Sequence, residues 1–171
     1  IAVDLITKAL AIRMNDAEAH SNLGLALQNL GRLNDAAASY RKALDIKSNY
    51  AEAYNNLGNV LRELGKPDDA AASYRKALTI KPDYASAHNN LGNVLSDIGR
   101  LEDAISSYQQ AVTIKPDYAE AYFNIGFSLQ CLGQVDAAVT SYRMALGIRP
   151  DYAEAHFNLG IALRHLGKLI D

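Results

Sequence analysis

The chain has 171 residues, 49% of them hydrophobic, and a formal net charge of −2, so no charge imbalance directs it toward nucleic acid or an acidic membrane surface. Its single cysteine, Cys131, excludes an internal disulfide and a cysteine-based metal cluster, and it favours a reducing compartment such as the cytoplasm. No segment approaches the ~18 consecutive apolar residues of a membrane-spanning helix, which predicts a soluble protein.

Closely similar segments recur every 34 residues along the chain. Tyr54-Asn-Asn-Leu-Gly-Asn-Val-Leu is followed by His88-Asn-Asn-Leu-Gly-Asn-Val-Leu and by Tyr122-Phe-Asn-Ile-Gly-Phe-Ser-Leu, and the same register fits the segments that begin at His20 and His156. A fixed period of this size indicates a solenoid, in which each unit buries its apolar face by stacking on its neighbours.

The period divides residues 1–171 into one array of helix pairs. Residues 1–16 match the second helix of a partial unit, and residues 153–171 match the first helix of another, which reads as a fragment of a longer array. The full units between them are 17–50, 51–84, 85–118 and 119–152.

Each unit predicts a helix, a short turn and a second, antiparallel helix. Asp117 with Glu120 and Asp151 with Glu154 have the spacing of a capping box at the start of the first helix, and Asn49 takes the same place before the unit 51–84. Glycine at the fifteenth repeat position is expected to end the first helix in a left-handed conformation. These glycines are Gly31, Gly65, Gly99, Gly133 and Gly167.

The core is predicted from the helical periodicity of each unit. Glycine recurs at the eighth position, inside the first helix, which implies that the second helix passes too close for a methyl group. Alanines and a tyrosine of the second helix are expected to fill that side, whereas Ser73 is assigned to the outer face. The glycines are Gly24, Gly58, Gly92, Gly126 and Gly160, and the tyrosines are Tyr40, Tyr74, Tyr108 and Tyr142.

The pattern resembles the tetratricopeptide repeat, with a bulky residue, Leu, Gly, Ala, Tyr, Ala and Pro at positions 4, 7, 8, 20, 24, 27 and 32. Ser48 departs from it by replacing the proline. The resemblance covers essentially the whole chain and implies an all-α fold, a right-handed α-α superhelix of antiparallel helix pairs. The sequences of the first helices resemble those in the repeat arrays of O-GlcNAc transferase-like proteins. The family resemblance also implies that the face of the first helix opposite the core is concave and binds ligands.

Asparagines recur on that predicted binding face. A carboxamide has donors and an acceptor, so a row of them suits the main chain of an extended peptide, as the resemblance implies for position six. The alternative is that they bond neighbouring helices and shape the superhelix, and the two roles are compatible. They are Asn22, Asn56, Asn90, Asn124 and Asn158 at position six, Asn59 and Asn93 at position nine, and Asn55 and Asn89 at position five.

All three phenylalanines, Phe123, Phe127 and Phe157, fall on the same predicted face. Solvent-facing aromatic residues grouped in this way often mark a binding patch, which would make this end of the face apolar. The alternative is that they pack against a neighbouring first helix. His20, His88 and His156 are instead expected to replace the core aromatic residue at position four.

Nothing in the sequence indicates an enzyme. No phosphate-binding loop, nucleophile elbow or catalytic carboxylate pair is present, and no metal or cofactor is predicted. The basic residues with which some tetratricopeptide domains hold a terminal carboxylate are missing, because the sixth position is never basic.

The leading interpretation is a protein–protein interaction module that binds an extended peptide or partner segment, with neither nucleic acid nor a membrane as partner. One alternative is a structural scaffold that stacks head to tail through its terminal half-repeats, because the apolar faces of Ile1–Asp16 and His156–Leu169 complement each other. The other is the substrate-recruiting part of a larger enzyme, such as a glycosyltransferase.

Overall fold

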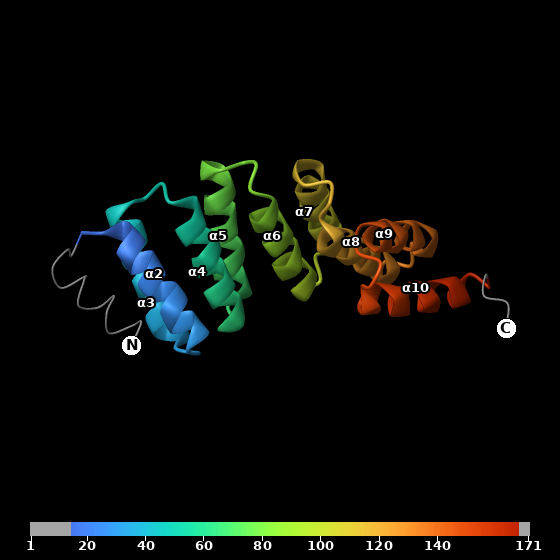
Figure 1. Cartoon of the computed structure of the whole chain (residues 1–171), viewed down its shortest axis with the longest axis horizontal. Helices are drawn as coiled ribbons and strands as arrows, with labels where there is room; N and C mark the ends of the chain where they lie inside the picture. Colours follow the sequence, from blue (N-terminus) through green and yellow to red (C-terminus); the bar gives the residue numbers. More distant parts are fainter. Residues whose placement is uncertain (1–14, 168–171) are drawn as a thin grey trace. The chain divides into compact units, whose positions relative to one another are not determined.

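The computed structural model describes residues 15–167, and every regular element within that range is an α-helix (Figure 1). The all-α expectation is therefore confirmed for the described residues. First helices begin at Ala17, Ala51, Ala85, Ala119 and Ala153, which reproduces the 34-residue period. The predicted helix at residues 1–16 lies almost wholly outside the described part.

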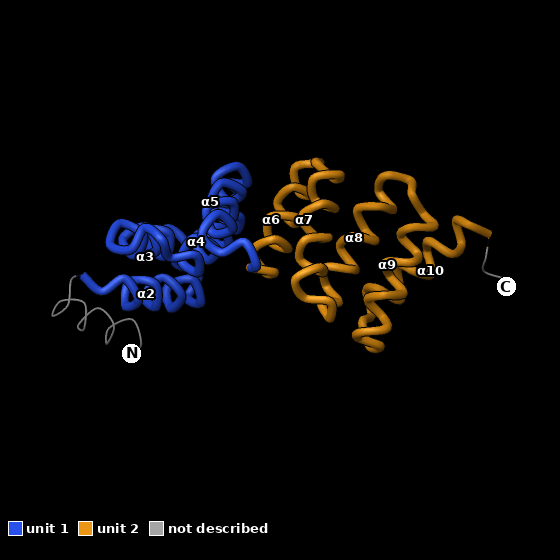
Figure 2. The backbone as a smooth tube through the Cα atoms, turned by 90° about the horizontal axis from the view of Figure 1, so that it is seen from above, with its two compact units in different colours: residues 1–83 blue, residues 84–171 orange. Residues whose placement is uncertain are grey.

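The chain divides into two compact units, residues 1–83 and 84–171 (Figure 2). In unit 1, α2 packs on α3, α4 packs on α5, and α3 joins the two pairs by contacting α4. The helices of unit 1 are α2 (Ala17–Asn29), α3 (Leu33–Ile46), α4 (Ala51–Glu63) and α5 (Pro67–Ile80).

Unit 2 repeats this arrangement and adds one further helix. Each helix packs on the next along the chain, and the first helices also contact one another, α6 with α8 and α8 with α10. The helices are α6 (Ala85–Asp97), α7 (Leu101–Ile114), α8 (Ala119–Cys131), α9 (Val135–Ile148) and α10 (Ala153–His165).

Glycine ends every first helix as the sequence predicts. Gly31, for example, has φ of 72°, and the N–H of the next residue, Arg32, reaches back to the carbonyl of Leu27 at 2.9 Å. A residue without Cβ adopts this left-handed conformation at no steric cost, so the turn to the second helix forms readily. The other four have φ between 63° and 78°: Gly65, Gly99, Gly133 and Gly167.

The glycine inside the first helix receives the tyrosine ring of the second helix, which identifies the close approach that the sequence predicts. A Cβ built on Gly58 would lie 2.6 Å from Cε1 of Tyr74, and one on Gly92 would lie 2.5 Å from Cε1 of Tyr108. Gly24 and Gly126 meet their tyrosines in the same way. Gly160 differs, because a Cβ there has no atom within 4 Å among the described residues.

The predicted capping boxes are wrong for α4, α8 and α10. The N-cap residues there are Tyr50, Tyr118 and Tyr152, none with a side-chain cap bond, so Asn49, Asp117 and Asp151 lie one residue too early. A cation covers each tyrosine ring, and the Arg149 guanidinium carbon lies 3.5 Å from the centre of the Tyr152 ring. In α2 the same repeat position is Asp16 instead of a tyrosine, and its side chain accepts from the Ala19 N–H at 3.0 Å.

Two further expectations about burial are wrong. Ser73 is only 8% exposed, and its hydroxyl donates to the Asp69 carbonyl at 2.9 Å, so it does not belong to an outer face. Its equivalent Ser39 is 6% exposed on α3, a helix that contacts both α2 and α4. Conversely, His156 is exposed, with its Nε2 2.7 Å from the Pro150 carbonyl oxygen, and does not fill the core.

Candidate functional site

Three asparagines and a tyrosine of unit 2 form a hydrogen-bonded network that joins two successive repeats. The Nδ2 of Asn124 on α8 donates to Oδ1 of Asn89 at 3.2 Å and to Oδ1 of Asn93 at 3.0 Å, both on α6. The hydroxyl of Tyr108 on α7 also donates to Oδ1 of Asn93, at 2.9 Å. We call Asn89, Asn93, Asn124 and Tyr108 the carboxamide network.

The members of the network differ in exposure. Asn89 is 1% exposed, whereas Asn93 and Asn124 are half-buried. The expectation that position five faces solvent is therefore wrong for Asn89, and also for Asn55, which is 5% exposed. For Asn89 the physical reason is the contact between α6 and α8, which places Asn124, at position six, over positions five and nine of α6.

The network uses only part of the hydrogen-bonding capacity of its exposed members. Both N–H groups of Asn124 are committed, but its Oδ1 takes no part in the network. Asn93 accepts twice through Oδ1, and its Nδ2 takes no part. One half-buried acceptor and one half-buried donor therefore lie on neighbouring helices, an arrangement that suits a partner with both a donor and an acceptor.

The other predicted asparagines lie in varied surroundings. In unit 1, Asn55 donates to Asn56 at 3.3 Å, and Asn59 accepts from the Tyr74 hydroxyl at 2.7 Å. Asn22 is exposed and Asn90 is half-buried. Asn158 on α10 donates to its own helix, at the Glu154 carbonyl 2.8 Å away.

The phenylalanines explain why the network stops at α8. In the register set by Asn124, the side chain of Asn158 would face positions five and nine of α8, which are Phe123 and Phe127. Neither ring offers an acceptor, and Asn158 turns to its own backbone instead.

Only two of the three phenylalanines are exposed. Phe127 is 45% exposed and Phe157 is 70% exposed, as expected for a surface patch. Phe123 is only half-buried and packs inward, with its ring centroid 5.8 Å from that of Tyr142 and 5.1 Å from that of Tyr152. Phe123 therefore supports the core of unit 2, and Phe127 and Phe157 are its solvent-facing aromatic residues.

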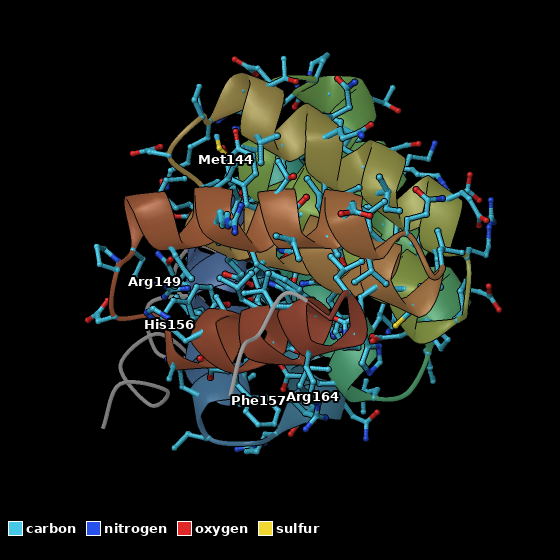
Figure 3. All side chains as sticks on the ribbon, turned by 90° about the vertical axis from the view of Figure 1, so that its right-hand side faces the viewer. Met144, Arg149, His156, Phe157 and Arg164 are labelled. Atoms are coloured by element: carbon cyan, nitrogen blue, oxygen red, sulfur yellow. The ribbon has the colours of Figure 1, made fainter. Side chains whose placement is uncertain are left out.

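The outward side of α10 combines this aromatic surface with basic side chains. Figure 3 shows Phe157 and Arg164 on the same side of α10, and both are exposed. Arg149, just before α10, is stacked on Tyr152. Burial raises the pKa of the Tyr152 phenol and the nearby Arg149 charge opposes that rise, so the phenol is a neutral donor at neutral pH.

The tyrosine hydroxyls are polar groups that the sequence pattern did not predict. Tyr74 and Tyr108 were expected to fill the core as rings, yet each hydroxyl donates to a position-nine asparagine. The signal was present as a constant separation of 15 residues, between Asn59 and Tyr74 and between Asn93 and Tyr108. A buried phenol generally finds an acceptor, so this spacing was informative.

No described helix combines the length and apolar character needed to cross a bilayer. No three described His, Cys, Asp or Glu side chains come together where they could hold a metal ion.

Comparisons with known proteins agree with the repeat architecture. A family model described as "TPR repeat" matches residues 29–65, 58–99, 95–130 and 131–167. No curated protein sequence matches the chain. The crystal structure of MamA is 29% identical, covers 89% of this chain and 89% of its own, and has a TM-score of 0.82. YrrB, described as "a TPR protein with an unusual peptide-binding site", is 28% identical, covers 98% of this chain and 86% of its own, and has a TM-score of 0.81.

A third structure, described as the functional characterization of pilF from Pseudomonas aeruginosa, is 25% identical, covers 89% of this chain and 69% of its own, and has a TM-score of 0.82. These neighbours confirm the fold class as an all-α helical repeat of the α-α superhelix type. Tetratricopeptide proteins are generally non-catalytic, and the fold with its neighbours supports a protein-interaction or scaffold role. The chain belongs to the tetratricopeptide repeat family.

Proposed function

We propose that the chain is a peptide-binding module in which Asn93 and Asn124 hold the main chain of an extended partner segment. The observation that carries the proposal is the carboxamide network, which fixes both side chains in place and leaves the Nδ2 of Asn93 and the Oδ1 of Asn124 for a ligand. A peptide unit offers one N–H and one C=O and so complements this pair irrespective of its side chain. The peptide-binding site in the description of YrrB adds support.

Phe127 and Phe157 would take apolar side chains of the same partner. Phe127 lies three residues after Asn124 on α8, so the two side chains are neighbours on one helix face. An extended strand alternates its side chains, so main-chain binding at Asn124 leaves an apolar side chain free to meet Phe127. The further asparagines at Asn22, Asn56, Asn90 and Asn158 extend the proposal to the other first helices.

The test is a peptide array, followed by affinity measurements on the peptides that bind. Changing Asn56, Asn90 and Asn124 together to Ala should lower the affinity of these peptides about tenfold or more, because hydrogen bonds to the peptide are lost. The helicity of the chain should not change. Tyr108→Phe is the matched control, since it removes a network bond and keeps every carboxamide. Changing Phe127 and Phe157 to Ser should alter which peptides are preferred. Normal binding by the triple variant would mean that the asparagines are structural only.

A second proposal, self-association, is favoured by one observation on α10. Within residues 15–167, no atom lies within 4 Å of a Cβ built on Gly160, whereas the four equivalent glycines each receive a tyrosine ring. A second copy would cover this face head to tail with the second-helix pattern of residues 1–16, of which 1–14 lie outside the described residues. A heterologous contact of this kind adds copies until something caps it.

Gly160→Leu should reduce that association without harming the fold, because a Cβ at this position meets no atom of the described residues within 4 Å. Sedimentation equilibrium over a range of concentrations is the measurement, with the unsubstituted protein associating and the variant remaining a monomer. Leu159 and Leu163 are unsuitable for this test because they pack against a buried cluster of their own unit, which consists of Ala138, Val139, Tyr142 and Ala162. A wild-type chain that is monomeric at high concentration would exclude the proposal.

The finer resemblance to O-GlcNAc transferase-like arrays supports a third reading, recruitment of substrates for a catalytic domain elsewhere in a parent chain. It uses the same peptide-binding surface and so makes the same prediction for the Asn variants. Expression with and without such a domain would separate the two.

A further inference from the structure

Three of the four second-helix tyrosines donate their hydroxyl to a carboxamide of the preceding first helix. The acceptor is Asn59 for Tyr74 and Asn93 for Tyr108, both at position nine. Tyr142 has Phe127 at that position and donates instead to Oε1 of Gln130, at position twelve, over 2.9 Å. A carboxamide at either position therefore satisfies the buried phenol.

Tyr40 is the exception. Its side chain is completely buried, and its hydroxyl has no hydrogen-bond partner among the described residues. Position nine of its repeat is Leu25, which offers no acceptor. Burial, followed by the nearby charge of Glu63, raises the pKa of Tyr40 to about 12, so the hydroxyl remains a donor at neutral pH. A buried donor without an acceptor costs free energy, and such groups are rare in folded proteins.

The repeat nevertheless contains the carboxamide that would satisfy it. Gln28 occupies position twelve, as Gln130 does, and each precedes its tyrosine by 12 residues. The contact between Gln130 and Tyr142 shows that a glutamine at this position reaches the phenol. In unit 1, however, Nε2 of Gln28 donates to Oε1 of Glu63 on α4 at 2.6 Å, and the phenol is left without it.

We propose that Glu63, Gln28 and Tyr40 form a binding subsite for a basic side chain, Arg or Lys, of the peptide partner. The cation binds the exposed carboxylate of Glu63 and displaces Gln28, whose oxygen then accepts the hydroxyl hydrogen of Tyr40. This subsite rests on the proposed function in assuming a peptide partner, and it lies within unit 1, apart from the carboxamide network.

Two physical effects favour a cationic ligand. A guanidinium makes two parallel charge-assisted hydrogen bonds to a carboxylate, against the one that Gln28 makes. The displaced carboxamide of Gln28 also gains a new hydrogen bond, because it accepts from the buried phenol of Tyr40. Binding of a cation at Glu63 and formation of the hydrogen bond from Tyr40 to Gln28 are therefore coupled. A ligand that does not bind Glu63 gains no affinity from this coupling.

The experiment uses the full chain and two probes of the same shape, N-acetylarginine amide and its neutral analogue N-acetylcitrulline amide. Nuclear magnetic resonance follows the side-chain amide of Gln28, assigned from its loss in Gln28→Met. We expect the arginine probe to shift that signal to saturation, and the citrulline probe to leave it in place. Glu63→Gln should abolish the response.

Tyr40→Phe separates this subsite from a structural role. It should raise the midpoint of thermal unfolding, because it removes a buried hydroxyl that has no hydrogen-bond partner among the described residues. It should also lower the affinity of the arginine probe about fivefold to tenfold. Tyr74→Phe is the matched control: it removes the bond to Asn59, so it should lower the midpoint and leave the probe affinity unchanged.

Three outcomes would overturn the proposal: equal binding of both probes, an unmoved Gln28 signal at saturation, or full affinity in Tyr40→Phe. A single amino acid presents no extended main chain, so these outcomes leave the test of Asn56, Asn90 and Asn124 unaffected. Failure of that test, in turn, would not remove the response at Gln28.

Discussion

Gly58→Ala is expected to destabilise the protein by about 1–3 kcal/mol, although alanine is the better helix former. The added methyl group would lie 2.6 Å from the ring of Tyr74, which is 1% exposed and so has little room to move. Overpacking of this kind outweighs the roughly 1 kcal/mol that alanine contributes in a helix interior. Urea denaturation monitored by circular dichroism gives the free energy of unfolding.

Gly160→Ala is the matched control, at the same repeat position on α10. In the part of the chain that the structure describes, a Cβ there has no atom within 4 Å, so the helix propensity of alanine acts alone and should stabilise the protein by about 0.5–1 kcal/mol. The two substitutions should thus have opposite signs. Equal effects at both positions would show that the tyrosine ring is not what requires glycine.

Tyr142→Ala is expected to lower the free energy of unfolding by about 3–5 kcal/mol. Tyr142 is completely buried among Ala138, Val139 and Ala162, and Phe123 packs on its ring, so truncation leaves a cavity that these neighbours cannot close. Because each repeat depends on its nearest neighbours, the loss should be concentrated in α8, α9 and α10. Hydrogen exchange would locate it.

Phe157→Ala provides the comparison, since it removes an aromatic ring of similar size that is 70% exposed. Its effect on stability should stay within about 0.5 kcal/mol, as is usual for surface substitutions. A large loss at Phe157, or a small one at Tyr142, would contradict the assignment of the core of unit 2.

Periodicity was sufficient to predict the helices and their turns, because both depend on local geometry that recurs in every repeat. Gly31 and Gly58 illustrate this: one needs a left-handed conformation and the other needs space, and each requirement shows in a single residue. The N-cap of α8 was misplaced because Asp117 and Glu120 have the residue types and spacing of a capping box, whereas the helix has Tyr118 as its N-cap without a side-chain cap bond. The Lys115 ammonium lies over the Tyr118 ring.

The candidate site was predicted less completely, for a related reason. Projecting one helix assigns Asn89 and Asn124 to the same open face, but a projection contains no neighbouring helix. Contact between α6 and α8 buries Asn89 and turns Asn124 toward it. The hydrogen bonds between repeats, and the half-used groups that they leave, are therefore products of packing.

The two kinds of contact described here behave differently when repeats are copied. The fit of Tyr74 against Gly58 lies within one 34-residue segment, so a duplicated or deleted segment carries both halves of it, and arrays can gain or lose members without redesigning their interior. The bonds of Asn124 to Asn89 and Asn93 span two segments and persist only where the neighbour has kept its asparagines. The number of repeats can thus change without loss of the core. A binding surface of this kind, in contrast, requires two adjacent repeats that have both kept their asparagines.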